Sequence, residues 1–551
     1  MRIKPIQLQL TNQLVQDYLN QDNNIQAYFD YPPFEAGKER LADLRKRSFQ
    51  REALVETLHK LNANWDAPQE VFEQIERLKN ANSVVVIGGQ QAGLMTGPMY
   101  TLNKVISILT LAKQKEKQLN IPVIPVFWIA GEDHDYDEIN HIYSSKDTKL
   151  YKHTSPQQLY FKKSISSVRI EKEKTAEWIK HAFRDLRETE HTKSLYECIQ
   201  LCLQKSTSYV DFFARLIFML FPNQGIVLID SAHPDVRKLE RKAFKQLIYR
   251  QPDISSSVYN AVQKLHQKGY APSLEAEIDD AHLFYHDANN ERILLKREGD
   301  LWVGKNEELV LTTDQLIQTA EEEPERLSNN VVTRPIMQET LFPTLAFVGG
   351  DGEISYWAAL RGAFRAYDEN LHVPPVFPRL KFTYITNRIE KLLTTRVLEP
   401  EHVLEHGVDD VKINWLMTQE TPPIETVFDG VKEKVDKLHF PLQQLAETIS
   451  PDLANEARKN IRLIQNQLAY LENKTKLKLE ERYELELEQY TEIGNQLKPN
   501  QLLQERVWSP LPFINEYGIG FINKLLEKEL SFHENHNLVY LNSYFNSLHS
   551  H

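Results

Sequence analysis

The sequence contains very little cysteine. Cys198 and Cys202 are the two cysteines, and they lie four positions apart in SLYECIQLCLQ, a segment whose apolar spacing is typical of a helix. Two thiols without further Cys or His residues nearby make a poor zinc site and no disulfide framework. We therefore expect two small hydrophobic side chains without a redox role.

Basic residues are fewer than acidic residues. The 551 residues include 65 Lys and Arg against 77 Asp and Glu, a formal net charge of −12. This balance argues against a broad nucleic-acid or anionic-membrane surface, which needs clustered basic residues. No run of about 18 apolar residues occurs, and the N-terminal MRIKPIQLQLTNQLVQ has no signal-peptide core. We expect a cytoplasmic protein of two or three domains that contacts neither nucleic acid nor membrane.

The common phosphate-binding fingerprints are missing from a segment that begins like one. VVVIGGQQAGLMTGPMYTLNKVISILTLA (84–112) predicts a strand over 84–87, a glycine turn, and a helix that has Pro98 at its first position. A Walker A motif is excluded because Leu94 and Met95 follow Gly93, and G-x-G-x-x-G is absent.

A strand, a glycine turn and a helix N-terminus nevertheless direct free N–H groups at one point, which favours an anion. The predicted nucleotide- or anion-binding residues are Gly88, Gly89, Gln90, Gln91, Gly93 and Gly97. A tight connection without a ligand is an equally open interpretation.

Three further apolar runs, at 121–130, 225–230 and 345–348, each end in glycine or acidic residues and alternate with helical patterns. This alternation predicts an α/β fold with a doubly wound, Rossmann-like parallel sheet in residues 1–420, and ligands beyond the carboxyl ends of its strands. Insertions are expected at about 145–220, with helices, and at about 270–330, with an antiparallel meander over 282–304.

Polar side chains gather after two of these strands. GEDHDYDEIN places Glu132, Asp133 and His134 directly behind a hydrophobic strand, where they could bind a metal, bind an amine or sugar hydroxyls, or accept a proton. Recognition of an amine or hydroxyl is favoured over a metal, and a solvated acidic turn is the other alternative.

Two arginines are candidate anion-binding groups. Arg334 precedes a proline, which predicts an extended backbone, and Arg379 lies in the similar PPVFPRLK. A guanidinium can hold a carboxylate at two points, although a structural ion pair is the commoner role of a single arginine. With Glu353 and Tyr356, which open the helix after 345–348, they form a predicted substrate-binding group.

Residues 421–500 show a different pattern. Leucine and isoleucine recur at steps of three and four from Leu438 to Leu471, with Ser450 and Pro451 at a helix start between two runs. The pattern predicts an antiparallel coiled-coil arm that forms a homodimer. A hairpin packed on its own chain is the alternative.

The last segment, 501–551, is expected to return to the core. Trp508, Phe513, Tyr517 and Gly518 lie in it. Aromatic residues of this kind are usually packing groups, and a second nucleotide pocket is the alternative.

Five blocks, in this order, carry a resemblance that covers nearly the whole chain. They are IGGQQAGLMTGPMYTLNKVISILTLA, PVFWIAGEDHDYDEINH, TRPIMQETLFPTLAFVGGDGEISYW, FPRLKF and LQERVWSPLPFINEYG. They closely resemble the bacillithiol biosynthesis cysteine-adding enzymes of low-GC Gram-positive bacteria. The resemblance implies a ligase that adds L-cysteine to glucosaminyl-malate, a nucleotidyltransferase-like Rossmann core, and coiled-coil dimers. The H-I-G-H and K-M-S-K-S motifs of class I aminoacyl-tRNA synthetases are absent.

The hypothesis that follows is an amide-forming ligase. ATP is the simplest means of activating the cysteine carboxyl, and the residues around Gly88 would bind its phosphates or a developing oxyanion. Asp133 or His134 would orient the attacking amine and accept its proton. The need for a metal stays open. A dimeric nucleotide- or metabolite-binding scaffold without catalysis is the alternative function.

Overall fold

The computed structural model describes residues 1–9, 12–35, 37–146, 148–306 and 308–541. They divide into two compact units. The first comprises the described residues of 1–146, 150–386 and 503–541, and the second those of 148–149 and 387–502. Within the part of the chain that is described, no helix is both long and apolar enough to cross a membrane.

A five-stranded parallel sheet forms the centre of the first unit, in the order β13-β12-β2-β3-β6. Its strands are β2 (Val84–Gln90), β3 (Val123–Ile129), β6 (Val227–Asp230), β12 (Thr344–Gly349) and β13 (Val376–Pro378). Consecutive residues of β3, β6, β12 and β13 are buried, so both faces of the sheet are covered. The order is that of the Rossmann fold, which confirms the predicted fold class.

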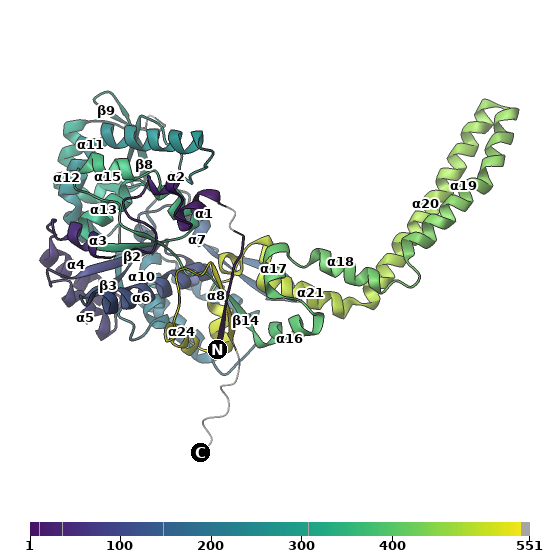
Figure 1. The fold of residues 1–551 in the computed structure, drawn as a ribbon, viewed down its shortest axis with the longest axis horizontal. Helices are drawn as coiled ribbons and strands as arrows, with labels where there is room; N and C mark the ends of the chain where they lie inside the picture. Colours follow the sequence, from purple (N-terminus) through teal and green to yellow (C-terminus); the bar gives the residue numbers. More distant parts are fainter. Residues whose placement is uncertain (10–11, 36, 147, 307, 542–551) are drawn as a thin grey trace, which may run out of the picture. The chain divides into compact units, whose positions relative to one another are not determined.

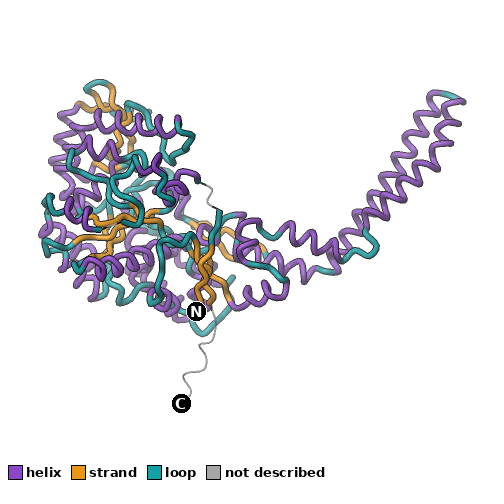
Figure 2. Tube along the Cα trace, in the orientation of Figure 1, coloured by secondary structure: helices purple, strands orange, loops and turns teal. Residues whose placement is uncertain are grey.

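Helices surround these strands, as Figures 1 and 2 show. Those before and between the strands are α1 (Gln13–Leu19), α2 (Asn23–Gln26), α3 (Lys38–Leu44), α4 (Arg51–Asn64), α5 (Gln69–Arg77), α6 (Met99–Leu119), α10 (Tyr209–Leu220), α11 (Pro234–Gln267), α13 (Thr333–Leu341), α14 (Asp351–Trp357) and α15 (Arg361–Tyr367). Contacts with the sheet come from α3, α4, α5, α6 and α14, among others.

Two inserted segments occur close to the predicted positions. The first contains α7 (Tyr136–Ile139), β4 (His141–Lys146), β5 (Lys149–Thr154), the short helix η2 (Ile165–Ser167), α8 (Lys172–Arg184) and α9 (Thr192–Lys205). The second contains β7 (Asp280–His286), β8 (Arg292–Glu298), β9 (Leu301–Gly304), β10 (Val310–Thr312), α12 (Thr313–Glu322), η3 (Pro324–Arg326) and β11 (Leu327–Asn329). Its strands form an antiparallel sheet in the order β10-β9-β8-β7-β11.

A strand near the start of the chain and one formed by its last described residues join a third, smaller sheet of the first unit. Strand β15 (His536–Leu541) pairs antiparallel with β1 (Arg2–Ile6) and parallel with β14 (Phe382–Thr386). Helices α22 (Gln504–Val507), α23 (Leu511–Tyr517) and α24 (Gly520–Leu526) precede it. Residues 503–541 of the last segment thus belong to the first unit, while 542–551 lie outside the described residues.

The second unit is helical. It contains α16 (Asn387–Arg396), α17 (Pro400–His406), α18 (Asp409–Thr418), α19 (Ile424–Ile449), α20 (Pro451–Arg482), α21 (Glu484–Leu497) and η4 (Pro499–Gln501). It begins at Asn387, not at the expected 421, because α16 and α17 pack on α21. Trp415 of α18 also lies against the ring of Tyr490, with centroids 5.8 Å apart.

Helices α19 and α20 form the predicted antiparallel hairpin, visible in Figure 1. The Ser450 side chain caps α20 by accepting from the Leu453 N–H at 3.2 Å, and Pro451 is the first helical residue, as predicted. Ion pairs join the two helices along their length and show that they run in opposite directions. Arg458 pairs with Glu447 (3.3 Å) near the reversal, and Lys476 pairs with Glu425 (2.8 Å) at the other end.

The predicted seam of the first limb is wrong. Leu438, Leu442, Leu445 and Ile449 are 77%, 57%, 59% and 63% exposed. The inner face of α19 instead carries His439, which is buried and lies 3.0 Å from Asn460, and the buried Ala446. A periodic stripe marks the apolar face of a helix but does not say which element covers it.

The second limb of the hairpin is followed by a break in the helix. Beyond Arg482 the helix breaks at Tyr483, and Ile493 of α21 is fully buried within its own unit. Leu477 and Leu485 remain 48% and 73% exposed. Ile493 is thus covered by the same chain, whereas Leu477 and Leu485 stay exposed.

Candidate functional site

A pocket of about 390 Å³ lies in the first unit where β2 and β12 end. The chain forms β2, β3 and β6 on one side of the sheet and later returns to the other side of β2 to form β12 and β13. The ends of β2 and β12 are therefore the topological switch point at which such folds bind ligands. The lining residues are Gly89, Gln90, Gln91, Tyr100, Lys104, Trp128, Ala130, Asp133, Glu138, Val331, Arg334, Pro335, Gln338, Phe347, Gly350, Asp351, Gly352, Glu353, Tyr356, Arg379 and Arg506. The volume falls in the range of small-molecule sites.

The predicted site residues are only partly brought together there. Asp133, Arg334, Glu353, Tyr356 and Arg379 line the pocket, as do Gly89, Gln90 and Gln91. Glu132, His134, Gly88, Gly93 and Gly97 do not belong to its lining.

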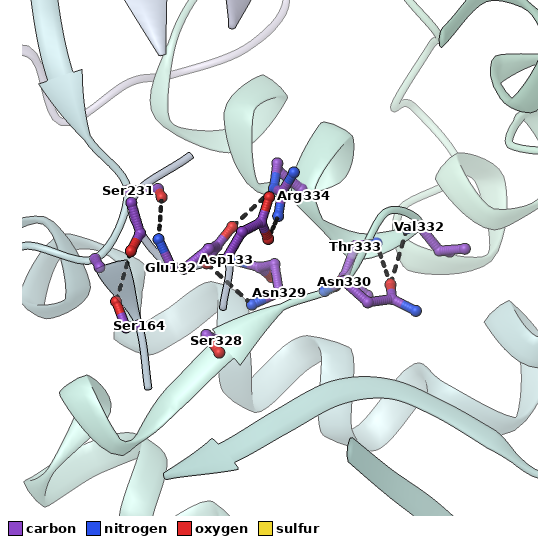
Figure 3. A network of polar contacts seen from close by, with 12 residues as sticks. Glu132, Asp133, Ser164, Ser231, Ser328, Asn329, Asn330, Val332, Thr333 and Arg334 are labelled. Carbon is purple, nitrogen blue, oxygen red and sulfur yellow. Dashed lines mark hydrogen bonds and ion pairs between the residues drawn. The ribbon is translucent and has the colours of Figure 1, made fainter. Parts of the chain in front are cut away.

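Glu132 is part of a buried polar network with Arg334 and Asn329 (Figure 3). Its carboxylate, which has no exposed surface, accepts from Arg334 Nε at 2.8 Å and from Arg237, and its second oxygen accepts from the Asn329 N–H at 3.3 Å. Burial alone would raise the pKa of Glu132, but the surrounding arginines lower it to about 2. The predicted substrate-binding role of Glu132 is therefore replaced by a structural one, because no face is left for a ligand.

Glu240 shares Arg237 with Glu132. It accepts from Arg237 Nη1 at 2.6 Å, while its Oε1 is buried without a hydrogen bond among the described residues. Burial raises the pKa of Glu240 to about 7, since Arg237 only partly offsets the loss of solvent and Glu132 adds a second negative charge.

Arg334 lies on a helix, contrary to the predicted extended segment. Asn330 starts α13 by accepting from the N–H groups of Val332 (2.8 Å) and Thr333 (3.2 Å), as Figure 3 shows. Pro335 is tolerated because the N–H groups of the first turn have no partner inside a helix.

Asp133 combines a fixed oxygen with an open one. Its Oδ1 accepts from Arg334 Nη2 at 2.5 Å and lies 3.4 Å from Arg292 Nη1. Its Oδ2 has no hydrogen bond within the described part of the chain, and the residue lines the pocket. A ligand donor can therefore bind Oδ2 without displacing either guanidinium.

His134 is held differently. Its Nδ1 lies 3.3 Å from Arg292 Nη1, and since a guanidinium can only donate, Nδ1 is the acceptor and the neutral ring carries its proton on Nε2. Burial and then the charge of Arg292 lower the pKa of His134. The ring is thus neutral at pH 7 and has its lone pair occupied.

Lys104 brings a buried cation to the pocket. Its Nζ donates to the Gly89 carbonyl at 2.7 Å, to Gln90 Oε1 at 3.2 Å and to Glu353. Burial lowers the pKa of Lys104, and Glu353 partly offsets the effect. Glu353 also accepts from the Gly350 N–H at 2.7 Å, which ties α14 to α6.

Arg379 is bound through two nitrogens to Glu505, at 2.6 and 2.7 Å, and both side chains are buried. Glu505 also accepts from Asn103 at 2.7 Å. Its neighbour Arg506 is exposed, lines the pocket, and has no side-chain hydrogen bond or ion pair among the described residues.

The predicted glycine turn is part of a strand. Gly88 and Gly89 lie inside β2, which continues to Gln90. A Cβ at Gly88 would lie 2.7 Å from the Val348 carbonyl oxygen, and one at Gly89 would overlap the Trp128 carbonyl. These glycines allow close strand packing and lie in a strand, not in the predicted turn.

The start of α6 also differs from the prediction. Pro98 is the N-cap and Met99 the first helical residue, and the Met99 N–H donates to the Trp508 carbonyl at 2.7 Å. Gly97 has a φ of 73° and a Cβ at Gly93 would lie 2.7 Å from its Cα, so both shape a tight turn. The helix end is partly closed by the return segment.

The aromatic residues of the return segment lie in the core. Trp508 and Phe513 are 3% and 1% exposed, and Tyr517 packs against the same hydrophobic cluster. Gly518, with a φ of 69°, ends α23 beside His191. The two buried rings have no open face for a nucleotide base.

One group of carboxylates outside the pocket could share a metal ion. Within the described residues it consists of Glu277, Asp279 and Asp280. Lys296 already pairs with Glu277 and Asp279, at 2.5 and 3.3 Å.

Two family models together match almost the whole chain. Residues 1–380 match the family model described as "Bacillithiol biosynthesis BshC, N-terminal Rossmann-like domain", and residues 382–541 match the one described as "Bacillithiol biosynthesis BshC, C-terminal coiled-coil domain". The chain belongs to the bacillithiol biosynthesis BshC family.

Relatives in the BshC family cover the chain almost end to end. A protein of Bacillus cytotoxicus is 42% identical over 542 residues (98% of this chain, 100% of the relative). Proteins of Oceanobacillus iheyensis and Bacillus cereus are each 39% identical, over 545 residues (98% and 100%) and 529 residues (96% and 98%). All three carry the name "Putative cysteine ligase BshC". The resemblance seen in the sequence is confirmed.

Sequence reasoning missed several residues of the BshC pocket, above all Lys104 and Arg506. A single charged residue in the largely apolar helix pattern of TLNKVISIL was a signal for Lys104, since a buried cation needs a partner. Arg506 lies inside the quoted block LQERVWSP, but no local pattern separates it from an ordinary surface arginine.

Proposed function

We propose that this BshC family member joins L-cysteine to the amino group of glucosaminyl-malate by an amide bond. The observation that carries the proposal is the pocket at the switch point, where Asp133 presents an open carboxylate oxygen beside several cationic side chains. The relatives' shared name supports cysteine as one substrate.

An amide forms when the amine attacks the cysteine carbonyl and an activated oxygen leaves, so the carboxyl must first be activated. ATP would supply that activation in the cytoplasm, and the anionic groups of the reactants would lie near Lys104, Tyr100 and the Gln91 side chain, which line the pocket. Lys104 donates to Glu353 at the end of β2, and this pair would place a polar, hydrogen-bonding group beside those anionic groups.

Asp133 is the better candidate of the two predicted bases. Its Oδ2 can accept a hydrogen bond from the substrate ammonium and then its proton. His134 has its Nδ1 occupied by Arg292, so it presents an N–H and no lone pair on Nε2. We assign His134 a positioning role: it accepts from Arg292, which in turn donates to the Asp133 carboxylate.

The experiment is reconstitution with cysteine, ATP and glucosaminyl-malate, followed by mass spectrometry of the thiol product. Asp133→Asn should reduce product formation by roughly 100-fold or more, the usual contribution of a general base. Asp135→Asn, at a more exposed carboxylate of the same loop, should stay within twofold of the wild type. A folded wild-type protein that forms no product, and whose deletion leaves cellular thiols unchanged, would favour the non-catalytic scaffold.

We also propose that the protein is a homodimer through α19 and α20. The apolar stripe of α19 lies on the outside of the hairpin, while the inside contains polar pairs such as His439–Asn460. A groove of about 530 Å³ borders this stripe and includes Leu442, Leu445 and Leu463. A second copy would cover the same patch on each chain, as in most closed homo-oligomers.

A further inference from the structure

We infer that Arg506 is the residue that binds a carboxylate of the malyl group, and that Arg334 and Arg379 are structural. This inference rests on the proposed function and assigns the substrate's acidic end to a position in the pocket. It follows from the charge inventory, from the way α22 is held, and from the chemistry of a substrate with an ammonium and carboxylates.

The charge inventory separates Arg506 from the other cations that line the pocket. Lys104 is bound to Glu353, Arg334 is bound to Asp133 and Glu132, and Arg379 is bound to Glu505. A new anion would have to compete with those carboxylates, and breaking a buried pair leaves an uncompensated charge. Arg506 has no such partner among the described residues, so a ligand carboxylate can pair with it at no such cost.

The segment that carries Arg506 is firmly anchored on both sides. Gln504 binds the backbone of Tyr384 twice, accepting from its N–H at 2.7 Å and donating to its carbonyl at 2.9 Å. Glu505 points into the protein to bind Arg379, and the Trp508 carbonyl accepts from the Met99 N–H at 2.7 Å. Residues on both sides of Arg506 are thus buried and hydrogen-bonded.

This anchoring has a consequence for binding. The Cα of Arg506 is fixed at the pocket edge, and only its side chain must be ordered when a ligand binds. The entropic cost of ordering one long side chain is smaller than the gain from a charge-assisted hydrogen bond. Binding of an anion is therefore favourable, and two-point contact favours a planar carboxylate.

The rest of the pocket suits the other end of such a substrate. The pocket lining contains four carboxylates, those of Asp133, Glu138, Asp351 and Glu353. The open Oδ2 of Asp133 matches an ammonium, and Arg506 matches a carboxylate. A bipolar amino sugar that carries a dicarboxylate provides both charges, whereas cysteine alone carries one carboxylate that must remain free to react.

The test measures binding of each ligand to the full-length protein by calorimetry. Arg506→Gln should weaken glucosaminyl-malate binding about 10- to 100-fold, the range that corresponds to a lost charged hydrogen bond, and Arg506→Lys should weaken it less. ATP binding should change less than twofold. The methyl glycoside of glucosamine, which lacks both carboxylates, should bind wild type and Arg506→Gln equally.

The control is Arg250→Gln, at an arginine of α11 that is about half exposed and does not line the pocket; it should bind every ligand like the wild type. Equal glucosaminyl-malate binding by wild type and Arg506→Gln would overturn the inference while the proposed function stands. Loss of ATP binding instead would assign Arg506 to a phosphate. A wild type that binds the methyl glycoside as tightly as glucosaminyl-malate would show that no residue binds the malyl group.

Discussion

Glu240→Gln offers the sharpest test of the buried charge network behind the pocket. Glu240 has an ordinary pKa of 4.5, and burial raises it to about 7 in the folded protein. Between these values the folded state keeps a proton that the unfolded state loses, so the free energy of unfolding falls as the pH rises. The stabilising contribution of neutral Glu240 is fully present below about pH 4.5 and is lost as the pH passes 7.

The magnitude follows from the two pKa values. One pKa unit corresponds to about 1.4 kcal/mol, so the change between pH 5 and pH 8 is about 2–3 kcal/mol. Unfolding entropy is about 2 cal/mol/K per residue, and for a unit of several hundred residues this change corresponds to about 3 °C in Tm. Glutamine keeps the shape and the acceptor for Arg237 Nη1 but cannot ionise.

The assay is calorimetry of both proteins at pH 5 and pH 8. Between pH 5 and pH 8, we expect the Tm of the wild type to fall by about 3 °C more than the Tm of Glu240→Gln. The variant should be the more stable protein at pH 8. Asp253→Asn, at an exposed carboxylate of the same helix, should follow the wild type at both. Parallel pH dependence of wild type and Glu240→Gln would refute the reasoning and show that Glu240 is ionised throughout.

Two further changes test the corrected fold assignments. Gly89→Ala should destabilise the first unit by about 1–3 kcal/mol, because its Cβ would overlap the Trp128 carbonyl in the sheet. The double change Leu442→Glu and Leu445→Glu should convert a dimer to a monomer in light scattering while the helix content measured by circular dichroism stays the same, since both side chains are exposed on the hairpin.

Matched controls separate these effects from general damage. Gly520→Ala has open space around its Cβ and should leave Tm unchanged; if Gly89→Ala kept wild-type stability but lost ATP binding, the original phosphate-turn hypothesis would return. Gln444→Glu with Thr448→Glu adds the same charge outside the apolar stripe and should leave the dimer intact. If light scattering gave the mass of a single chain for the wild-type protein, the dimer proposal would be wrong.

Local patterns were sufficient for most of the fold. Strands such as Val123–Ile129 are short β-branched runs between turn signals, and the reversal at Ser450 and Pro451 is defined by a cap and a first-turn proline. These features depend on neighbours in the sequence, so they could be predicted. The doubly wound, parallel type of the sheet followed from the alternation of strands and helices, and Asp133 was placed at the pocket by its position after β3.

Other features depend on contacts between distant segments. Glycine after an apolar run indicates a turn or a close approach, and only the neighbouring strands β3 and β12 show that Gly88 and Gly89 serve the second purpose. The apolar stripe from Leu438 to Ile449 was visible in the sequence, but the side on which α20 packs was not.

The sequence by itself determined the family, the alternating core, the hairpin and the strand ends that bear polar residues, because each is encoded by nearby residues or by whole blocks of similarity. Only the tertiary structure decided which charges are free. The sequence alone does not distinguish the arginines at 334, 379 and 506. In the structure, Arg334 is paired with Glu132 and Arg379 with Glu505, which lie more than a hundred residues away in the chain. An ion pair depends on distance in space, and that distance is set by packing.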